Sequence, residues 1–439
     1  MAGPLTASML SSGPGEPWSP AREVAVIDAL PARHHRRIGL YMLQIGMGLL
    51  LPCLCLGLAT MHAAFALALG GALLARFPLW RMPGFALALA FAGWQLLSLA
   101  PAWMEAPTKL PKGLGPAYVW LSLFLAQAAF VAPALRRWSL QLLLLTTACS
   151  ALLATAQFTV GLGGTSMWKV DSAGERYHLS VGFAPIHLTQ GFLMAMVSLV
   201  LIDARIIAGG LEPVQLWFCR GYALVAMVIS GARLALVALP FGLAVRSALA
   251  GGRRARLLAP AILISALVAG GGALLLLSPA SLGRMLHGED GRLAIWRVAA
   301  TEVLEHPWLG LGGSNAFHDS YNAAFARVLP QQDNEFAHQG GAPHAHNSLL
   351  SLAVDFGVPA AALYLAFLGR ALLPGWRARR GHPRAWALAL ALTVTSLVAG
   401  MFEDLSGHSA SSYATYVLIG LALALCQGER QGERPGGAA

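Results

Sequence analysis

Long apolar stretches recur along almost the whole sequence, and they restrict the possible folds more than any other feature. A helix needs about 20 mainly apolar residues to cross the roughly 30 Å hydrocarbon core of a bilayer. The chain is 56% hydrophobic and only 11% charged, which is outside the range of a soluble domain. We therefore predict an all-α polytopic membrane protein with about 12 transmembrane helices. The predicted spans are residues 38–58, 60–76, 84–101, 116–133, 138–160, 183–203, 216–231, 233–250, 257–277, 346–370, 385–402 and 409–426.

The basic residues predict the orientation of these spans. The formal net charge is +10, and in a membrane protein such an excess collects in the cytoplasmic connections, so no nucleic-acid partner is expected. With twelve spans, both termini are cytoplasmic and the long segment 278–345, between spans 9 and 10, lies on the other side. The ambiguous region is 216–250. One long helix broken near Pro240 would give eleven spans and would place the Arg253-Arg254-x-Arg256 cluster outside, against the positive-inside tendency.

Composition predicts the remaining organisation. Residues 1–37 begin with a stretch rich in Pro, Gly and Ser, so we expect a disordered cytoplasmic tail and no cleavable signal peptide. Spans 1–9 occupy residues 38–277, spans 10–12 occupy 346–426, and a second cytoplasmic tail covers 427–439. The five cysteines lie in or beside apolar stretches, where packing is their expected role.

The long segment 278–345 has a helical pattern of its own. After Asp290, a possible N-cap, an amphipathic helix is predicted that places Leu293, Trp296, Val303 and Leu304 roughly on one side. His306-Pro307 ends this helix, and a glycine-rich turn leads to a second short helix that reaches about Arg327. We expect a partly helical layer over the membrane surface.

A histidine stands where this segment returns to the membrane. If His346 starts a continuous helix, it shares one face with Leu350, Ala353 and Gly357. Small residues on that face would allow close packing, which would hold the imidazole rigidly. His346 is therefore the candidate catalytic base, although an interfacial histidine without chemistry fits the pattern about equally well.

Arginines supply the second group of candidates. Arg233 lies within an apolar stretch, where a charge is costly unless it faces a polar cavity or snorkels to the surface. Arg292, Arg297 and Arg284 lie in or before the first loop helix. A guanidinium matches phosphate oxygens, so we expect all four to bind a diphosphate, although arginines on an exposed helix are often merely solvated.

Metal motifs are missing from the sequence. It has no Asp-x-Asp pair, no phosphate loop with Lys-Ser/Thr and no His-Glu-x-x-His. His338, His344 and His346 lack a Cys or acid at zinc-ligand spacing, so no metal and no cofactor is expected.

His187 opens the sixth span from the same side as the long segment. We expect a group of residues to line or support the same cavity as His346, namely His344, Asn347, His338, His187 and Gly357.

Three motifs in this region together resemble a known family. They are Arg292-x-x-Ile-Trp, then His306-Pro-Trp-Leu-Gly-Leu-Gly, then His346-Asn-Ser with Gly357 eleven residues on. This set resembles the O-antigen ligase family, which shares a superfamily with O-antigen polymerases and bacterial protein oligosaccharyltransferases. The predicted spans, termini and long segment are also similar, so the resemblance covers about residues 38–426.

The resemblance implies a glycosyltransferase of lipopolysaccharide biosynthesis. Such an enzyme moves a polysaccharide from undecaprenyl diphosphate to lipid A-core oligosaccharide, on the periplasmic face of a Gram-negative inner membrane. His346 matches the family's histidine and Arg292 its loop arginine. Arg233 matches an arginine near the end of the mid-chain hairpin, but the family commonly has Ser-Arg where this chain has Ser230-Gly-Ala-Arg233.

Other functions remain open from the sequence. A polymerase of the same superfamily would join two carrier-linked units, and the sequence barely separates it from a ligase. A protein oligosaccharyltransferase is less expected, because its external C-terminal region should be longer. A twelve-span transporter or lipid-linked glycan flippase should show two similar halves, and no such repeat is visible.

Overall fold

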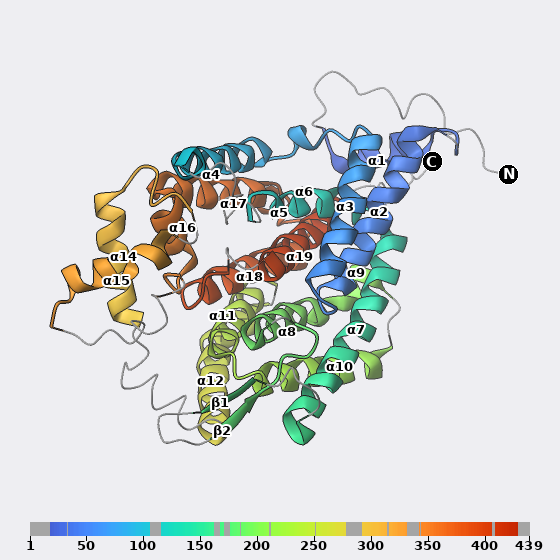
Figure 1. Ribbon diagram of the computed structural model, residues 1–439. Helices are drawn as coiled ribbons and strands as arrows, with labels where there is room; N and C mark the ends of the chain where they lie inside the picture. Colours follow the sequence, from blue (N-terminus) through green and yellow to red (C-terminus); the bar gives the residue numbers. More distant parts are fainter. Residues whose placement is uncertain are drawn as a thin grey trace.

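The computed structural model is a bundle of apolar helices with a small helical lobe at one end (Figure 1). It describes residues 18–32, 34–105, 116–161, 167–170, 176–184, 186–209, 212–250, 252–277, 292–313, 316–331, 342, 344–405 and 409–428. The predicted tail 427–439 lies almost entirely outside this part, as do Arg284 and His338.

Helices make up nearly all of the described structure, with one exception. Strands β1 (Met167–Val170) and β2 (Arg176–Leu179) pair as an antiparallel hairpin, which the all-α prediction missed. The helices are α1 (Pro20–Asp28), α2 (His35–Cys53), α3 (Leu58–Leu74), η2 (Leu79–Arg81), α4 (Phe85–Glu105), α5 (Pro116–Val119), α6 (Leu121–Ala129), α7 (Pro133–Val160), α8 (His187–Ile202), α9 (Ala204–Ala208), α10 (Pro213–Ile229), α11 (Arg233–Ala250), α12 (Arg253–Leu277), α14 (Arg292–Glu305), α15 (Ala316–Val328), α16 (Ser348–Phe356), α17 (Val358–Ala378), α18 (Pro383–Gly400) and α19 (Ser409–Gly428).

Their length and composition identify a multi-pass membrane protein. Five described helices are long and apolar enough to cross a bilayer, namely α7, α11, α17, α18 and α19. Shorter apolar helices accompany them, including α3, α4, α8 and α10. Every predicted apolar range contains one or two of the helices, but the number of crossings stays a prediction.

The C-terminal helices form the centre of the bundle. The red α18 and α19 lie between the blue N-terminal helices and the green α8 and α11 (Figure 1). Almost every residue of α19 is buried. Small residues allow this packing: a Cβ on Gly420 would lie 2.5 Å from Leu123 O of α6, and one on Gly242 of α11 would lie 3.2 Å from Ala391 O of α18. Close backbone approach of this kind is typical of helices packed in membranes.

The region 216–250 forms two helices. α10 ends at Ile229, and the buried turn Ser230–Ala232, with Gly231 at φ +67°, leads into α11. Pro240 lies inside α11 without ending it. The alternative of one helix broken near Pro240 is therefore wrong, and Arg233 stands at the start of α11.

The predicted N-terminal tail is partly ordered, contrary to expectation. Ser19 caps α1 by accepting a hydrogen bond from Arg22 N at 3.3 Å, and Pro20 occupies a favourable first-turn position. Ile27 is fully buried, and Glu23 pairs with Arg36 of α2 at 2.9 Å. Burial of one apolar face and this ion pair order a segment whose composition alone predicted disorder.

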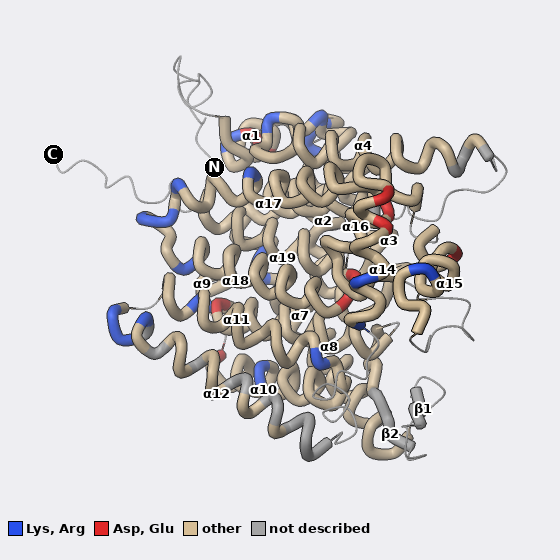
Figure 2. The backbone as a smooth tube through the Cα atoms, turned by 90° about the vertical axis from the view of Figure 1, so that its left-hand side faces the viewer, with Lys and Arg blue, Asp and Glu red and all other residues tan. Residues whose placement is uncertain are grey.

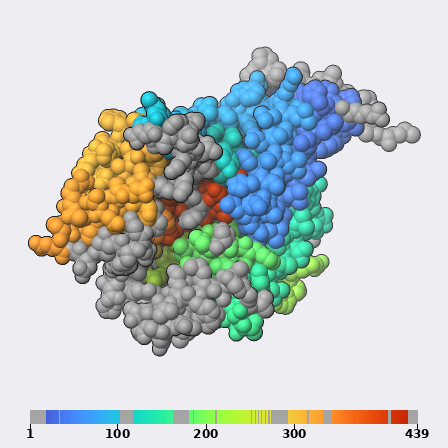
Figure 3. All heavy atoms as spheres, in the orientation of Figure 1, coloured from blue at the N-terminus to red at the C-terminus, as the bar shows by residue number. Residues whose placement is uncertain are grey.

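Two helices at one end form a lobe with its own small core. The α14–α15 lobe, residues 292–313 and 316–329, protrudes from the bundle, and the red C-terminal helices are visible between the lobe and the blue N-terminal helices (Figure 3). The helix ends agree with the prediction, since α14 stops just before His306-Pro307. The predicted apolar face is wrong, because Leu293 and Leu304 are exposed while Ile295, Val298 and Ala299 are buried. Buried Glu302 takes part in that inner face and pairs with Arg327 at 2.9 Å.

Backbone contacts fix the lobe on α16 and α17. Leu311 N donates to Val354 O at 2.8 Å, and Val358 N donates to Pro307 O at 2.9 Å. Gly357 makes this approach possible. Its φ is +85°, and a Cβ there would lie 1.8 Å from Trp308 O. Glycine is therefore required at this position of the motif, because the lobe closely contacts the backbone where α16 ends and α17 begins.

A substitution at Gly357 should detach the lobe. We expect Gly357→Ala to destabilise the protein by about 2–4 kcal/mol, because it adds a left-handed strain and a clash with backbone. Gly369→Ala is the matched control, since Gly369 lies within α17 with open space around it, and alanine favours a helix by about 1 kcal/mol. Thermal unfolding in detergent measures both. Equal melting temperatures for the two variants would contradict this account.

Candidate functional site

His346 lies in the turn that precedes α16. Asn347 is the N-cap of α16, and its Oδ1 accepts a hydrogen bond from Leu350 N at 3.1 Å. His346 itself has φ +48°, a conformation that non-glycine residues rarely adopt and that is often found at functional sites. The prediction of one continuous helix from His346 is therefore wrong at both ends, because Asn347 caps the helix and Gly357 ends it. The side chain is held instead by the chain segment after α18.

Glu403, in the segment that follows α18, faces this turn. Its side chain is only 2% exposed. Ser348 fixes the backbone on both sides: its Oγ donates to Glu403 O at 3.1 Å and accepts from Leu405 N at 2.9 Å. The first residue of α16 thus positions a buried carboxylate beside the turn that carries His346.

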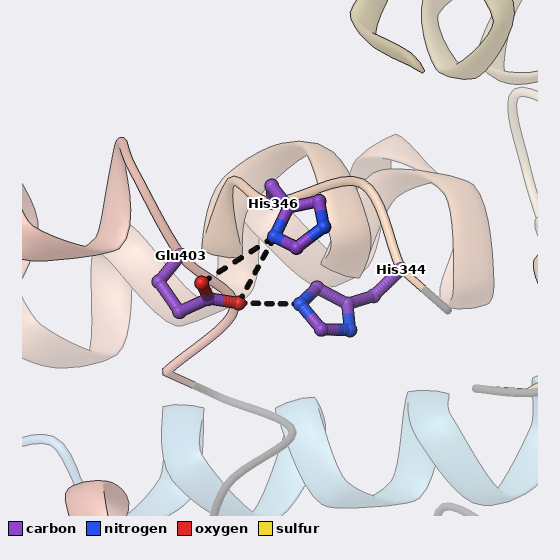
Figure 4. A group of neighbouring side chains, drawn as sticks. All are labelled: His344, His346 and Glu403. Carbon is purple, nitrogen blue, oxygen red and sulfur yellow. Dashed lines mark hydrogen bonds and ion pairs between the residues drawn. The ribbon is translucent and has the colours of Figure 1, made fainter. Parts of the chain in front are cut away.

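Both histidines of the His-Ala-His sequence bond to this carboxylate (Figure 4). His346 Nδ1 lies 3.2 Å from Glu403 Oε1 and 3.4 Å from Oε2, while His344 Nε2 contacts Oε1. The two rings are 4.3 Å apart, centroid to centroid. With Nδ1–H donated to the carboxylate, the Nε2 lone pair of a neutral His346 is directed away from Glu403, which is the arrangement of a base oriented by an acid.

The two histidines stabilise the negative charge of Glu403 in its buried position. Burial alone would raise the pKa of Glu403, but hydrogen bonds from His344 and His346 and their charges hold it well below its ordinary value. Burial alone would lower the pKa of His344, but the hydrogen bond and the charge of Glu403 outweigh it, so this pKa is raised. Asp404 adds to that rise and Arg292 opposes it. His344 therefore favours its protonated form beside the carboxylate.

Stability should depend on pH in a defined direction. A raised His344 pKa gives stability that is complete below the unfolded value of about 6.5 and is lost as pH rises through the folded pKa. A lowered Glu403 pKa gives stability present above about pH 4.3 and lost as pH falls through its folded value. We expect the melting temperature in detergent to fall from pH 6 to pH 8.5, and to fall less in His344→Gln. If the melting temperatures of the parent and of His344→Gln fell equally between pH 6 and pH 8.5, His344 would not carry the positive charge assigned to it.

The same three side chains have the types that bind metal ions. His344, His346 and Glu403 each offer one ligand atom, and these atoms lie within 4.8 Å of one another. Two ligands of one tetrahedral zinc ion lie about 3.4 Å apart, whereas His344 and Glu403 are in direct hydrogen-bond contact. His346 Nδ1 and Glu403 Oε1, at 3.2 Å, are close to the ligand separation of a zinc ion, so a chelator experiment is needed to test for a metal here. A second such group, Glu302, Glu305 and His306, has both carboxylates paired with Arg327.

The other predicted site residues have separate positions. Arg292 starts α14 and is close enough for its charge to act on His344. Arg297, further along α14, is exposed. Arg233 starts α11 and His187 starts α8, and both are half-buried. That they share one cavity with the histidine pair stays a prediction.

Glu403 was missed by sequence reasoning. It follows a long apolar stretch and adjoins Asp404, and acids at the end of a span are uncommon enough to be a signal. In the twelve-span arrangement the connection 403–408 lies on the same side as the long segment, but nothing in the sequence pairs it with a histidine 57 positions earlier.

The structure thus shows a multi-pass membrane protein in which a histidine bonds to a buried carboxylate at one end of a bundle of apolar helices. The family model described as O-antigen ligase matches residues 221–365, which contain α11 to α16 together with Arg233, Arg292 and His346. The predicted resemblance to that family is thereby confirmed over this segment. Glu403 lies beyond the matched segment. A search of curated proteins found no match to the chain.

Proposed function

We propose that this protein is an O-antigen ligase, a glycosyltransferase that moves O-antigen polysaccharide from undecaprenyl diphosphate to lipid A-core oligosaccharide. One observation carries the proposal. His346, inside the segment that matches the family, is hydrogen-bonded through Nδ1 to a buried carboxylate. Such a histidine suits the removal of a proton from an acceptor hydroxyl, which is the proton transfer this reaction needs.

The proposed reaction is a direct displacement. The acceptor hydroxyl oxygen attacks the anomeric carbon of the donor glycan, the bond from that carbon to the diphosphate oxygen breaks, and the hydroxyl proton passes to His346 Nε2. Undecaprenyl diphosphate departs with the electron pair, and the proton then returns to water. The carrier supplies its own leaving group, so no nucleotide and no metal is needed in this scheme. A single displacement inverts the anomeric centre, which the stereochemistry of the product would test.

Arginines stabilise the departing diphosphate in this scheme, and Arg292 is the best placed. We expect Arg292→Ala to lower kcat/KM by about 10²-fold, the effect of losing one charge-stabilising donor. Arg297→Ala is the comparison, because Arg297 was also predicted to bind the diphosphate but is exposed further along the same helix, so we expect a smaller loss than in Arg292→Ala. Kinetics with purified donor measures both variants. An equal effect of the two substitutions would remove Arg292 from the proposed site.

The proposed orientation has twelve spans, cytoplasmic termini and an active site facing the periplasm of a bacterial inner membrane. The charge distribution supports it. Basic residues group around α9 and the start of α12, at the other end of the bundle from α14 and α15 (Figure 2). Positive charge near membrane spans favours the cytoplasmic side, which supports a periplasmic position for the α14–α15 lobe and His346. Labelling of single cysteines introduced in the lobe, from outside intact spheroplasts, tests this orientation.

A transfer assay in purified membranes tests the function. The parent protein receives an undecaprenyl diphosphate-linked glycan and lipid A-core, with a chelator present and no nucleotide. We expect glycan on lipid A-core. Lengthening of the glycan on its carrier, without labelled lipid A, would instead identify an O-antigen polymerase. Loss of transfer with the chelator and its recovery with zinc would contradict the metal-independent scheme. Folded protein that shows neither reaction would favour a transporter or flippase.

A further inference from the structure

A groove of about 480 Å³ runs along the outer face of α10, on the side of the bundle opposite α17 (Figures 1 and 2). Its volume lies within the range of ligand-binding pockets. All of its described lining residues are exposed, and they are Val214, Trp217, Phe218, Gly221, Tyr222 and Val225. In a bilayer this face of α10 is open to lipid.

A glycine leaves room in the middle of the groove. A Cβ added at Gly221 would meet no other atom within 4 Å, so the space beside this residue is open. The rings of Phe218 and Tyr222 are stacked next to it, with centroids 6.4 Å apart. Apart from the tyrosine hydroxyl, the lining side chains are hydrocarbon or aromatic. The groove therefore suits a hydrocarbon chain that lies along the helix.

A cation stands beside this groove. The guanidinium carbon of Arg220 lies 5.2 Å from the centroid of the Trp217 ring. Arg220 Nη2 also donates to Leu201 O at 2.7 Å and to Ile202 O at 3.2 Å, the last carbonyls of α8. These neutral acceptors hold the guanidinium in place but leave its charge uncompensated. Arg220 thus joins the apolar groove to the end of a neighbouring helix.

Positive charge exceeds negative charge at this point of the bundle. Arg246 of α11 binds both oxygens of the buried Asp203, at 2.7 and 2.6 Å, so these two charges offset each other. Arg205 of α9 is exposed, and its charge acts on Arg220. In the described part of the chain neither Arg205 nor Arg220 pairs with an acid. Two cations therefore remain for an anion from outside the protein.

These groups lie at the depth of the lipid headgroups. α10 starts at Pro213, so at 1.5 Å per residue Trp217 and Arg220 stand about 6 and 10 Å along it. Tryptophan is enriched at this level of a membrane, and arginine reaches the headgroups from it. Basic residues also gather nearby, around α9 and the start of α12 (Figure 2). The proposed orientation places this end at the cytoplasmic leaflet, whose anionic lipids attract basic groups.

We propose that Arg205 and Arg220 bind the phosphate of an anionic phospholipid, one acyl chain of which occupies the groove of α10. Guanidinium groups offer N–H donors that match phosphate oxygens. The positive charge selects an anionic lipid over a zwitterionic one, whose own ammonium group cancels the phosphate charge. The apolar groove selects a lipid over free phosphate. This site needs a bilayer around α10 and does not depend on the glycan transfer reaction.

Native mass spectrometry of the delipidated protein in detergent tests the charge selection. We expect the parent to bind phosphatidylglycerol about tenfold or more tightly than phosphatidylcholine. Arg205→Gln should weaken phosphatidylglycerol binding about fivefold, the usual effect of one basic residue near anionic lipid. Arg377→Gln is the matched control, because Arg377 is exposed at the end of α17. Equal affinity of the parent for both lipids, or equal losses in the two variants, would overturn the assignment.

A second pair of variants tests the groove. Gly221→Leu should fill it and weaken phosphatidylglycerol binding about fivefold, because the acyl chain loses the burial of about one methylene group or more. Gly369→Leu is the matched control, since Gly369 also lies on a helix with open space around it. Leucine favours a helix over glycine, so both variants should fold. Equal binding by the two variants would overturn the groove as the acyl-chain site.

Photolabelling separates a lipid from other occupants. Phosphatidylglycerol with a photoreactive acyl chain should label α10 in the parent, and excess inorganic phosphate should not displace it. Displacement by phosphate would show a site for free anions instead. Cross-links between the Phe218 positions of two copies, unchanged by added lipid, would assign this face to a second copy of the chain. Binding is measured without a glycan, so failure here leaves the proposed function untouched.

Discussion

His346→Ala is expected to lower the rate of glycan transfer by about 10²–10⁴-fold, the usual contribution of a general base. The loss should fall on kcat, with little change in the KM for the donor, because the substituted group acts on the acceptor proton in the transition state. His346 stands in a turn at φ +48° and bonds to Glu403 rather than to the core. Removing its ring should therefore leave the fold intact.

The measurement is transfer from undecaprenyl diphosphate in detergent, with protein of verified melting temperature. His35→Ala serves as a control, because His35 is exposed at the start of α2 and contacts none of the site residues in the described part of the chain. Activity of His346→Ala equal to that of the control would show that this histidine is not the base. The scheme would then need another proton acceptor.

Glu403→Gln is expected to cause a loss of similar size, about 10²–10⁴-fold, although Glu403 does not touch the substrate. Glutamine keeps the shape of the side chain but loses the negative charge that holds both histidines and raises the pKa of His344. A second readout separates positioning from a structural role. The loss should fall on kcat, with little change in the KM for the donor, because the carboxylate acts through the base in the transition state.

Glu403→Asp provides the conservative comparison. It keeps the charge and should recover part of the activity, since a shorter side chain can still accept one hydrogen bond at reduced strength. Failure of aspartate to recover any activity, together with a raised KM rather than a lowered kcat in Glu403→Gln, would indicate that Glu403 serves only the packing of α16 against the end of α18. Both variants need a measured melting temperature, because Glu403 is almost completely buried.

Hydropathy predicted the helices of the bundle well, because each apolar range must form a helix to satisfy its backbone hydrogen bonds in a membrane. It did not predict where helices break. The prediction at His346 failed because Asn347, a strong N-cap, and Gly357, at positive φ, limit α16 to Ser348–Phe356. Both signals were present in the sequence, but the eleven-residue spacing was interpreted as one helical face.

The candidate site was predicted only in part for a different reason. His346 and Arg292 stand in short motifs, which local sequence reveals. Glu403 reaches His346 because the end of α18, at Gly400, lies beside Ser348, and Ser348 bonds the backbone of both Glu403 and Leu405. Such a contact depends on tertiary packing, which periodicity does not encode. The exposed Leu293 and Leu304 show the same limit, since Ile295, Val298 and Ala299 form the buried face of α14 in the core that this helix shares with α15.

The most direct test of the acid–base site is a double-mutant cycle on His346 and Glu403. The transfer rates of the parent, His346→Ala, Glu403→Gln and the double variant are measured at one pH with saturating donor. If Glu403 acts through His346, the double variant should be no slower than His346→Ala alone, because residues that act as a unit are strongly non-additive. Rate losses that multiply in the double variant would contradict this account and show that the two residues act independently.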